Sequence, residues 1–186
     1  MNTFNKLNSA VFTEFFLGVF TLLTTACGPS EQSAEGQPVE NRALASLVLE
    51  VEPTEILSVA DARKQAKSGE LVKVSGQIGG IGKPFVSGYA GFVLADASVT
   101  FCDEFGDDHC PTPWDACCED VDKLNALRIS VQFVDVESNP IEGDLKNLPG
   151  LKELDSVVVV GTVAEGLTAD NMVINATGLF RNEQSE

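Results

Sequence analysis

The chain has 186 residues, enough for one domain with a single hydrophobic core beside short flanking segments. Its 28 acidic and 12 basic side chains leave a formal net charge of −16, which argues against binding to the phosphate backbone of nucleic acids. After the N-terminal segment, no apolar stretch approaches the roughly 20 residues that a membrane-spanning helix needs. Composition therefore points away from nucleic-acid binding and from a chain that crosses the membrane repeatedly.

Residues 1–26 have the pattern of a secretory signal peptide. Lys6 and the α-amino group precede an apolar run over residues 15–23, which is too short to span a bilayer, and small residues follow up to Cys27. The small residue directly before Cys27 resembles a bacterial lipobox, in which a signal peptidase cuts before a Cys that carries a diacylglyceryl group. The resemblance implies export and a lipid anchor on Cys27 in the bacterial cell envelope, and Gly28 implies the outer membrane, facing the periplasm or the surface. Cleavage without lipidation and retention of the segment as an anchor are the alternatives.

Residues 27–53 are predicted to link the lipidated Cys to the domain. Residues 28–41 are small and polar, contain Pro and Gly, and lack the apolar periodicity of a packed element. As a flexible coil, such a tether spans about 20 Å r.m.s.. The alternating apolar residues 44–51 fit either an extra strand laid on the domain or an apolar leader to it, and the pattern does not decide between them.

A short helix is predicted over residues 60–66, with Ser58 as its N-cap and Gly69 as a left-handed stop. Strand patterns then dominate, with apolar residues that alternate with polar ones or form short runs. One or two helical turns are predicted over residues 144–154, and a disordered tail over 182–186. The predicted strands are residues 71–78, 89–95, 127–134, 156–163 and 171–176.

Five strands with a helix between the third and the fourth is the element order of an OB-fold, a mainly β, five-stranded Greek-key barrel. Gly76 and Gly161 fit positions where a barrel strand coils sharply and a side chain would clash. We therefore predict an OB-fold domain over residues 54–181, with one or two short helices and a Cys-rich loop inserted between strands 2 and 3.

Two resemblances support this fold. Val-Ser-Gly-Gln-Ile at 74–78, Tyr-Ala-Gly-Phe-Val-Leu-Ala-Asp at 89–96, Val-Val-Val-Val-Gly-Thr-Val at 157–163 and Met-Val-Ile-Asn-Ala at 172–176 together resemble the OB pattern of tRNA-anticodon-binding domains. The Gly-Gly pair at 79–80 and the motif Cys-Pro-Thr-Pro-Trp-Asp-Ala-Cys-Cys at 110–118 resemble a group of exported bacterial OB-like lipoproteins. Neither resemblance implies a particular activity or ligand.

The cysteine loop, residues 98–123, contains four of the five cysteines. Disulfides are the expected state of cysteines in an exported protein, and lipidation of Cys27 would remove the odd thiol. Neighbouring side chains diverge, so a bond between the adjacent Cys117 and Cys118 is disfavoured. Two connectivities stay open: Cys102–Cys117 with Cys110–Cys118, or Cys102–Cys118 with Cys110–Cys117.

A soft-metal site is the alternative for this loop. His109, Cys110, Cys117 and Cys118 offer ligands for zinc or copper, although the CxxC spacing of zinc ribbons is absent. A thiol-redox role is a further alternative, which the lack of CxxC and of a basic neighbour disfavours. Apart from this alternative, no cofactor is expected.

The candidates for a binding surface are Tyr89, Phe92, Trp114 and Asp115. Packing inside the barrel is the competing interpretation for the aromatic residues, and for Trp114 it is a small core within the loop. The acidic balance favours cationic proteins or small ligands over anions as partners.

No GxSxG, HExxH, P-loop or Rossmann motif is present, so no catalytic residue is predicted and an enzyme is not expected. The sequence thus predicts an envelope lipoprotein whose OB-fold is a binding or interaction module. The alternatives are a metal-binding or thiol-redox protein, which would use the segment from Cys102 to Cys118, and a single-stranded nucleic-acid binder, which the net charge disfavours.

Overall fold

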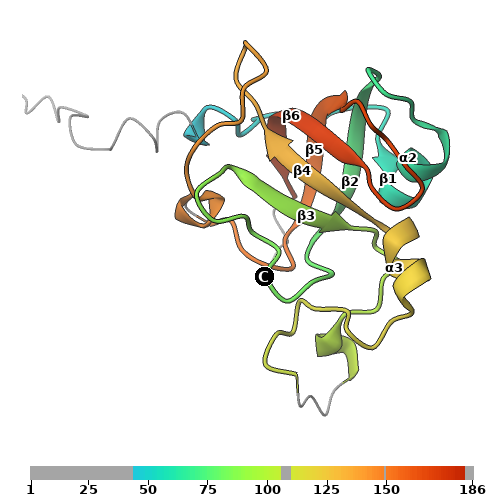
Figure 1. Ribbon diagram of the computed structural model, residues 1–186. Helices are drawn as coiled ribbons and strands as arrows, with labels where there is room; N and C mark the ends of the chain where they lie inside the picture. Colours follow the sequence, from blue (N-terminus) through green and yellow to red (C-terminus); the bar gives the residue numbers. More distant parts are fainter. Residues whose placement is uncertain (1–43, 106–109, 149, 183–186) are drawn as a thin grey trace, which may run out of the picture. The chain divides into compact units, whose positions relative to one another are not determined.

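Five strands of the chain close into a β-barrel in the computed structural model, which describes residues 44–105, 110–148 and 150–182 (Figure 1). Neighbours in the barrel follow the order β2-β3-β4-β6-β5, and pairing of β5 with β2 completes the circle. A short strand, β1, joins the outside of this circle through parallel pairing with β2. The strands are β1 (Leu57–Ser58), β2 (Leu71–Ile78), β3 (Gly91–Ala95), β4 (Arg128–Phe133), β5 (Ser156–Val163) and β6 (Val173–Arg181).

The pairing directions are those of an OB-fold. β4 and β6 run parallel, whereas every other neighbouring pair in the barrel is antiparallel. This is a five-stranded Greek-key barrel. The predicted fold class is therefore confirmed: the chain is mainly β, and the cysteine loop lies between the second and third barrel strands, here β3 and β4.

The strands fall close to their predicted positions. β2 and β5 coincide with the predicted residues 71–78 and 156–163. β6 continues to Arg181, five residues past its predicted end. The predicted strand ended before Gly178, but this glycine pairs with Val160 of β5. Its missing side chain leaves room for Leu49, because a Cβ on Gly178 would lie only 3.1 Å from the side-chain carbons of Leu49.

The helices are shorter than the strands and agree less well with the sequence. Ser58 caps α2 (Val59–Gln65) as predicted, because its Oγ accepts a hydrogen bond from Asp61 N at 3.0 Å. Gly69 has a φ of +79°, but it lies in the turn before β2 and does not end the helix. The helical turn predicted between the third and fourth barrel strands is the 3-10 turn η2 (Leu145–Asn147). α3 (Val121–Ala126), at the end of the cysteine loop, was not predicted.

Gly76 and Gly161 lie where strands cross closely, as predicted. A Cβ on Gly76 would lie 2.4 Å from the carbonyl oxygen of Ala95. A Cβ on Gly161 would lie 2.4 Å from the carbonyl oxygen of Asn175, next to a shift in the β5–β6 register. Both positions therefore exclude a side chain and let the strands coil tightly enough to close the barrel.

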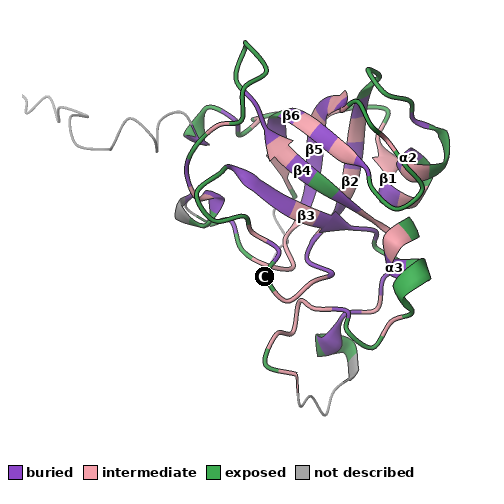
Figure 2. Ribbon diagram, in the orientation of Figure 1, coloured by how far each residue is buried: buried purple, intermediate pink, exposed green. Residues whose placement is uncertain are grey.

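The barrel interior is filled by aliphatic side chains around Phe92 and Phe133, whose ring centroids are 6.0 Å apart. The barrel strands are buried along much of their length (Figure 2). A second, smaller core packs beneath the cysteine loop, and its members include Phe101, Ala116 and Leu124. The loop therefore has apolar packing of its own.

The leader over residues 44–51 lies on the barrel. Leu44 and Leu47 are buried in the main core, and Leu49 N donates to Leu179 O at 2.8 Å. One parallel bridge, between Val48 and Leu179, takes the place of a regular strand. The predicted signal peptide, the predicted lipidation site Cys27, most of the predicted tether, His109 and residues 183–186 of the predicted tail lie outside the described residues. Within the ranges 44–105, 110–148 and 150–182, no helix is long and apolar enough to cross a membrane.

Candidate functional site

A groove of about 280 Å³ crosses the face that β3 and β4 form. It lies between the loop that follows β2 and the loop that precedes β6, which are the loops between strands 1 and 2 and between strands 4 and 5 of an OB-fold. OB-folds bind ligands on this face and with these two loops. The groove is lined by Ile81, Val93, Arg128, Ile129, Ser130, Asp170, Asn171 and Met172.

Polar groups and apolar walls share the groove. The guanidinium of Arg128 is held on one side, where it donates to Asn125 Oδ1 at 3.0 Å and to Gly80 O at 3.5 Å. Ser130, Asp170 and Asn171 are exposed, so their hydroxyl, carboxylate and amide groups are accessible. The groove can therefore hydrogen-bond a polar ligand while Ile81 and Val93 contact its apolar parts.

The loop that carries Asp170 is fastened to α2. Arg63 of that helix donates a hydrogen bond to Ala169 O. Burial lowers the pKa of Arg63, and the nearby charge of Asp170 acts in the opposite direction. One side of the groove is thus supported by a helix rather than by loop backbone alone.

The binding-surface candidates predicted from the sequence do not line the groove. Phe92 is 1% exposed and packs inside the barrel, which is the competing interpretation for this residue. Tyr89 is 48% exposed, but it pairs with Glu142 and does not line the groove. Trp114 is half-buried and Asp115 accepts a hydrogen bond from Ala116 N, both within the cysteine loop. The only sequence signal for the groove was its position in the predicted OB-fold, because its polar lining residues are of types that are common on any surface.

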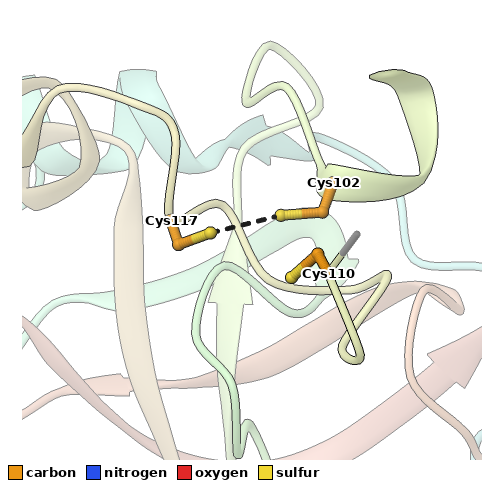
Figure 3. Close-up of side chains that lie close together, drawn as sticks. All are labelled: Cys102, Cys110 and Cys117. Carbon is orange, nitrogen blue, oxygen red and sulfur yellow. Dashed lines mark hydrogen bonds between the residues drawn. The ribbon is translucent and has the colours of Figure 1, made fainter. Parts of the chain in front are cut away.

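Three cysteines of the loop meet at one point (Figure 3). The Sγ atoms of Cys102, Cys110 and Cys117 all lie within 4.8 Å of one another, and we call this group the thiol cluster. Cys102 Sγ and Cys117 Sγ lie 3.6 Å apart. Cys102 is buried, Cys110 is half-buried and Cys117 is exposed, so the cluster opens to solvent on one side.

Backbone hydrogen bonds hold the two arms of the loop together. Cys102 N donates to Asp115 O at 2.8 Å, and Asp103 N donates to Pro113 O at 3.1 Å. Thr112 sits beside Cys110, with its Oγ1 at 3.3 Å from the sulfur. The cluster is therefore positioned by the fold of the loop.

The three thiols differ in acidity. Burial raises the pKa of the Cys102 thiol. The hydrogen bond with Cys102 raises the pKa of Cys117 to about 12, whereas the hydrogen bond with the Thr112 hydroxyl lowers the pKa of Cys110. Cys110 is therefore the thiol of the cluster that ionises first as pH rises.

The cluster overlaps the predicted metal site in two residues. Cys110 and Cys117 belong to both, Cys102 joins them, and Cys118 is exposed outside the cluster. All four cysteines carry free thiols in this structure, so the two disulfides stay a prediction. Thiolates at this spacing could hold a soft metal ion.

No protein-family model matches the chain, and the comparison with curated proteins finds no match. Among solved structures, the chain is similar to a protein described as an aspartyl-tRNA synthetase from Leishmania major Friedlin, at 10% sequence identity and a TM-score of 0.41. The similarity covers 74% of this chain and 23% of that chain. A likeness this weak says nothing about the fold or the function of this chain. The pairing of the strands identifies the OB-fold.

Proposed function

We propose that the chain is an exported, lipid-anchored binding module of the bacterial envelope that takes its ligand in the groove between Ile81 and Asn171. The observation that carries the proposal is the location of this groove, on the face and between the loops that OB-folds use for ligands. Export and the anchor rest on the signal-peptide pattern and on Cys27.

The lining favours a small polar ligand. Ser130, Asp170 and Asn171 offer both hydrogen-bond donors and acceptors, and the walls provide limited apolar contact. A single-stranded nucleic acid fits poorly, because no aromatic side chain among the described residues lines the groove for base stacking and the net charge is −16. Neutral or cationic ligands are therefore expected over anionic ones.

A groove-filling substitution tests the proposal. Residues 28–186 are exported behind a standard signal peptide and titrated calorimetrically with envelope oligosaccharides, cationic peptides and single-stranded oligonucleotides. We expect binding from the first two classes only, and we expect Ser130→Trp to abolish it because the indole would occupy the groove. Val136→Trp is the matched control, since Val136 is fully exposed and lies outside the groove. Equal affinity of Ser130→Trp and wild type for every ligand would refute the groove as the site.

The lipid anchor is tested separately. Cys27→Ala should release the protein from the membrane fraction and remove the mass of the acyl groups from its N-terminus. A protein that stays in the membrane fraction after this substitution would contradict lipidation at Cys27 and leave the groove proposal untouched.

A further inference from the structure

We propose that the thiol cluster of Cys102, Cys110 and Cys117, in its reduced form, binds one thiophilic cation, and that Cu⁺ is the ion it fits best. This site is separate from the groove, and the proposal does not depend on the ligand that the groove takes.

The spacing of the sulfurs fits a central ion. Metal–thiolate bonds are about 2.3 Å long, so three sulfurs around one ion lie about 4 Å apart. In the cluster, one pair is 3.6 Å apart and every pair lies within 4.8 Å. Small rotations of the three side chains are therefore enough to bring all sulfurs to bonding distance, without a change in the backbone.

The donor set selects the kind of ion. The ligand atoms gathered here among the described residues are all thiol sulfurs. Sulfur ligands favour Cu⁺ and Zn²⁺ over Ca²⁺ and Mg²⁺, which take oxygen ligands. A structural zinc site takes four ligands, whereas the described part of the chain gathers three thiols here, a number that satisfies Cu⁺.

The cysteine loop is preorganised for an ion. The backbone hydrogen bonds of Cys102 and Asp103 to Asp115 and Pro113 keep the two arms in register. Cys102 lies on the buried side and Cys117 on the exposed side, which leaves the ion a path from solvent. Little ordering of the chain therefore accompanies binding, and preorganisation of this kind strengthens affinity.

The binding step balances without a redox partner. Three S–H bonds break, three protons pass to solvent, and three copper–sulfur bonds form around Cu⁺, which keeps its oxidation state. A disulfide between Cys102 and Cys117 would remove two of the three ligands. Cation binding and this disulfide therefore exclude each other.

The test is a competition titration of the reduced, exported protein (residues 28–186) under anaerobic conditions, with Cu⁺ and the chelator bathocuproine disulfonate. We expect one equivalent of Cu⁺ per chain and sulfur-only coordination in X-ray absorption, with bonds of about 2.3 Å. Cys110→Ser and Cys117→Ser should each weaken the affinity by about 100-fold or more, at least as much as the loss of an outer-shell partner. Both residues lie outside the buried core, so these variants are expected to fold.

Cys118→Ser is the matched control, because it removes a thiol that neighbours the cluster without belonging to it. Its affinity for Cu⁺ should equal that of the wild type. The proposal is overturned by absence of Cu⁺ binding to the reduced protein, by full affinity in Cys110→Ser, or by an equal loss in Cys118→Ser. Binding of the groove ligand in Cys110→Ser should stay unchanged, which separates this proposal from the proposed function.

Discussion

The indole N–H of Trp114 donates a hydrogen bond to the carbonyl oxygen of Gly82 at 3.1 Å. Next to it, Gly80 N donates to Trp114 O at 2.9 Å. These two bonds fasten the cysteine loop to the loop after β2, whose Ile81 lines the groove. The thiol cluster and the groove thus share residues 79–82 as a common support.

Trp114→Phe should loosen this support. The substitution removes the bond to Gly82 and should lower the free energy of unfolding by about 1 kcal/mol. Amide hydrogen exchange should accelerate at Gly80 and Ile81, and mass spectrometry of peptides that cover residues 79–82 measures it. Tyr89→Phe is the control, because the Tyr89 side chain is half-exposed and belongs neither to the groove lining nor to the thiol cluster. Unchanged exchange in Trp114→Phe would show that the indole does not support this loop.

Asp96→Asn should lower stability in a pH-dependent way. Asp96 is 6% exposed and accepts hydrogen bonds from Ala60 N at 2.7 Å and from Ser98 Oγ at 2.7 Å. Burial alone would raise the pKa of Asp96, but these hydrogen bonds hold it below its ordinary value of about 3.9. Its stabilising contribution is therefore complete above about pH 4 and is lost as pH falls through the lower pKa of the folded state.

Urea unfolding between pH 2 and pH 7 measures this contribution. At neutral pH, Asp96→Asn should cost about 1–3 kcal/mol, and the difference from the wild type should shrink below about pH 3.9. The comparison cancels the titration of the other carboxylates, which both proteins share. A difference that is independent of pH would show that the charge of Asp96 does not stabilise the fold.

Gly161→Ala should destabilise the barrel through a clash. The added Cβ would lie 2.4 Å from Asn175 O and 2.7 Å from Ala176 Cα, and neither backbone atom can move without shifting β6. Overpacking of this kind costs about 1–3 kcal/mol. Gly166→Ala isolates the cost of backbone strain, since Gly166 has a φ of +83° and open space around it. A loss in Gly161→Ala no larger than about 1 kcal/mol, the cost of that strain, would contradict the close approach of β5 and β6.

Protein exported to an oxidising compartment should form two disulfides. Its intact mass should be about 4 Da below that of the reduced chain, with no thiol open to alkylation. The 3.6 Å between Cys102 Sγ and Cys117 Sγ favours a bond between them, which leaves Cys110 to pair with Cys118. Peptide mapping without reduction distinguishes this connectivity from Cys102–Cys118 with Cys110–Cys117. The oxidised protein should bind no Cu⁺, and reduction should restore the site.

The strands could be predicted because their signal is local. β2 alternates between buried and partly buried residues, and β5 is a nearly continuous run of Val, so both appear in the sequence at their true bounds. α3 was not predicted because a helix of six residues is too short to show a clear helical periodicity of apolar residues. Its start is marked only by Asp120, whose side chain accepts from Asp122 N and Lys123 N.

The candidate sites depended on contacts that a sequence does not display. The groove draws on three separate segments, around Ile81, Ser130 and Asp170, and each contributes residue types that are common on surfaces. In the cysteine loop, the predicted metal site joined His109 and Cys118 to Cys110 and Cys117, whereas the structure brings Cys102 to Cys110 and Cys117. A hydrogen bond from Asp115 N to Thr112 O closes a turn over Thr112–Asp115, and Asp115 O in turn accepts from Cys102 N. The sequence does not display these contacts, which place Cys102 in the cluster.

Trp114 is the single tryptophan of the chain, and it occupies the junction between the cysteine loop and the groove. The intrinsic fluorescence excited at the red edge of protein absorption therefore comes from this junction alone. Copper and disulfides both quench an indole at short range, whereas a ligand in the groove would change the polarity around it through residues 80–82. Trp114 is thus an intrinsic fluorescent probe. With one unlabelled sample, its fluorescence can report first the redox state of the cysteine loop and then the binding of a ligand in the groove.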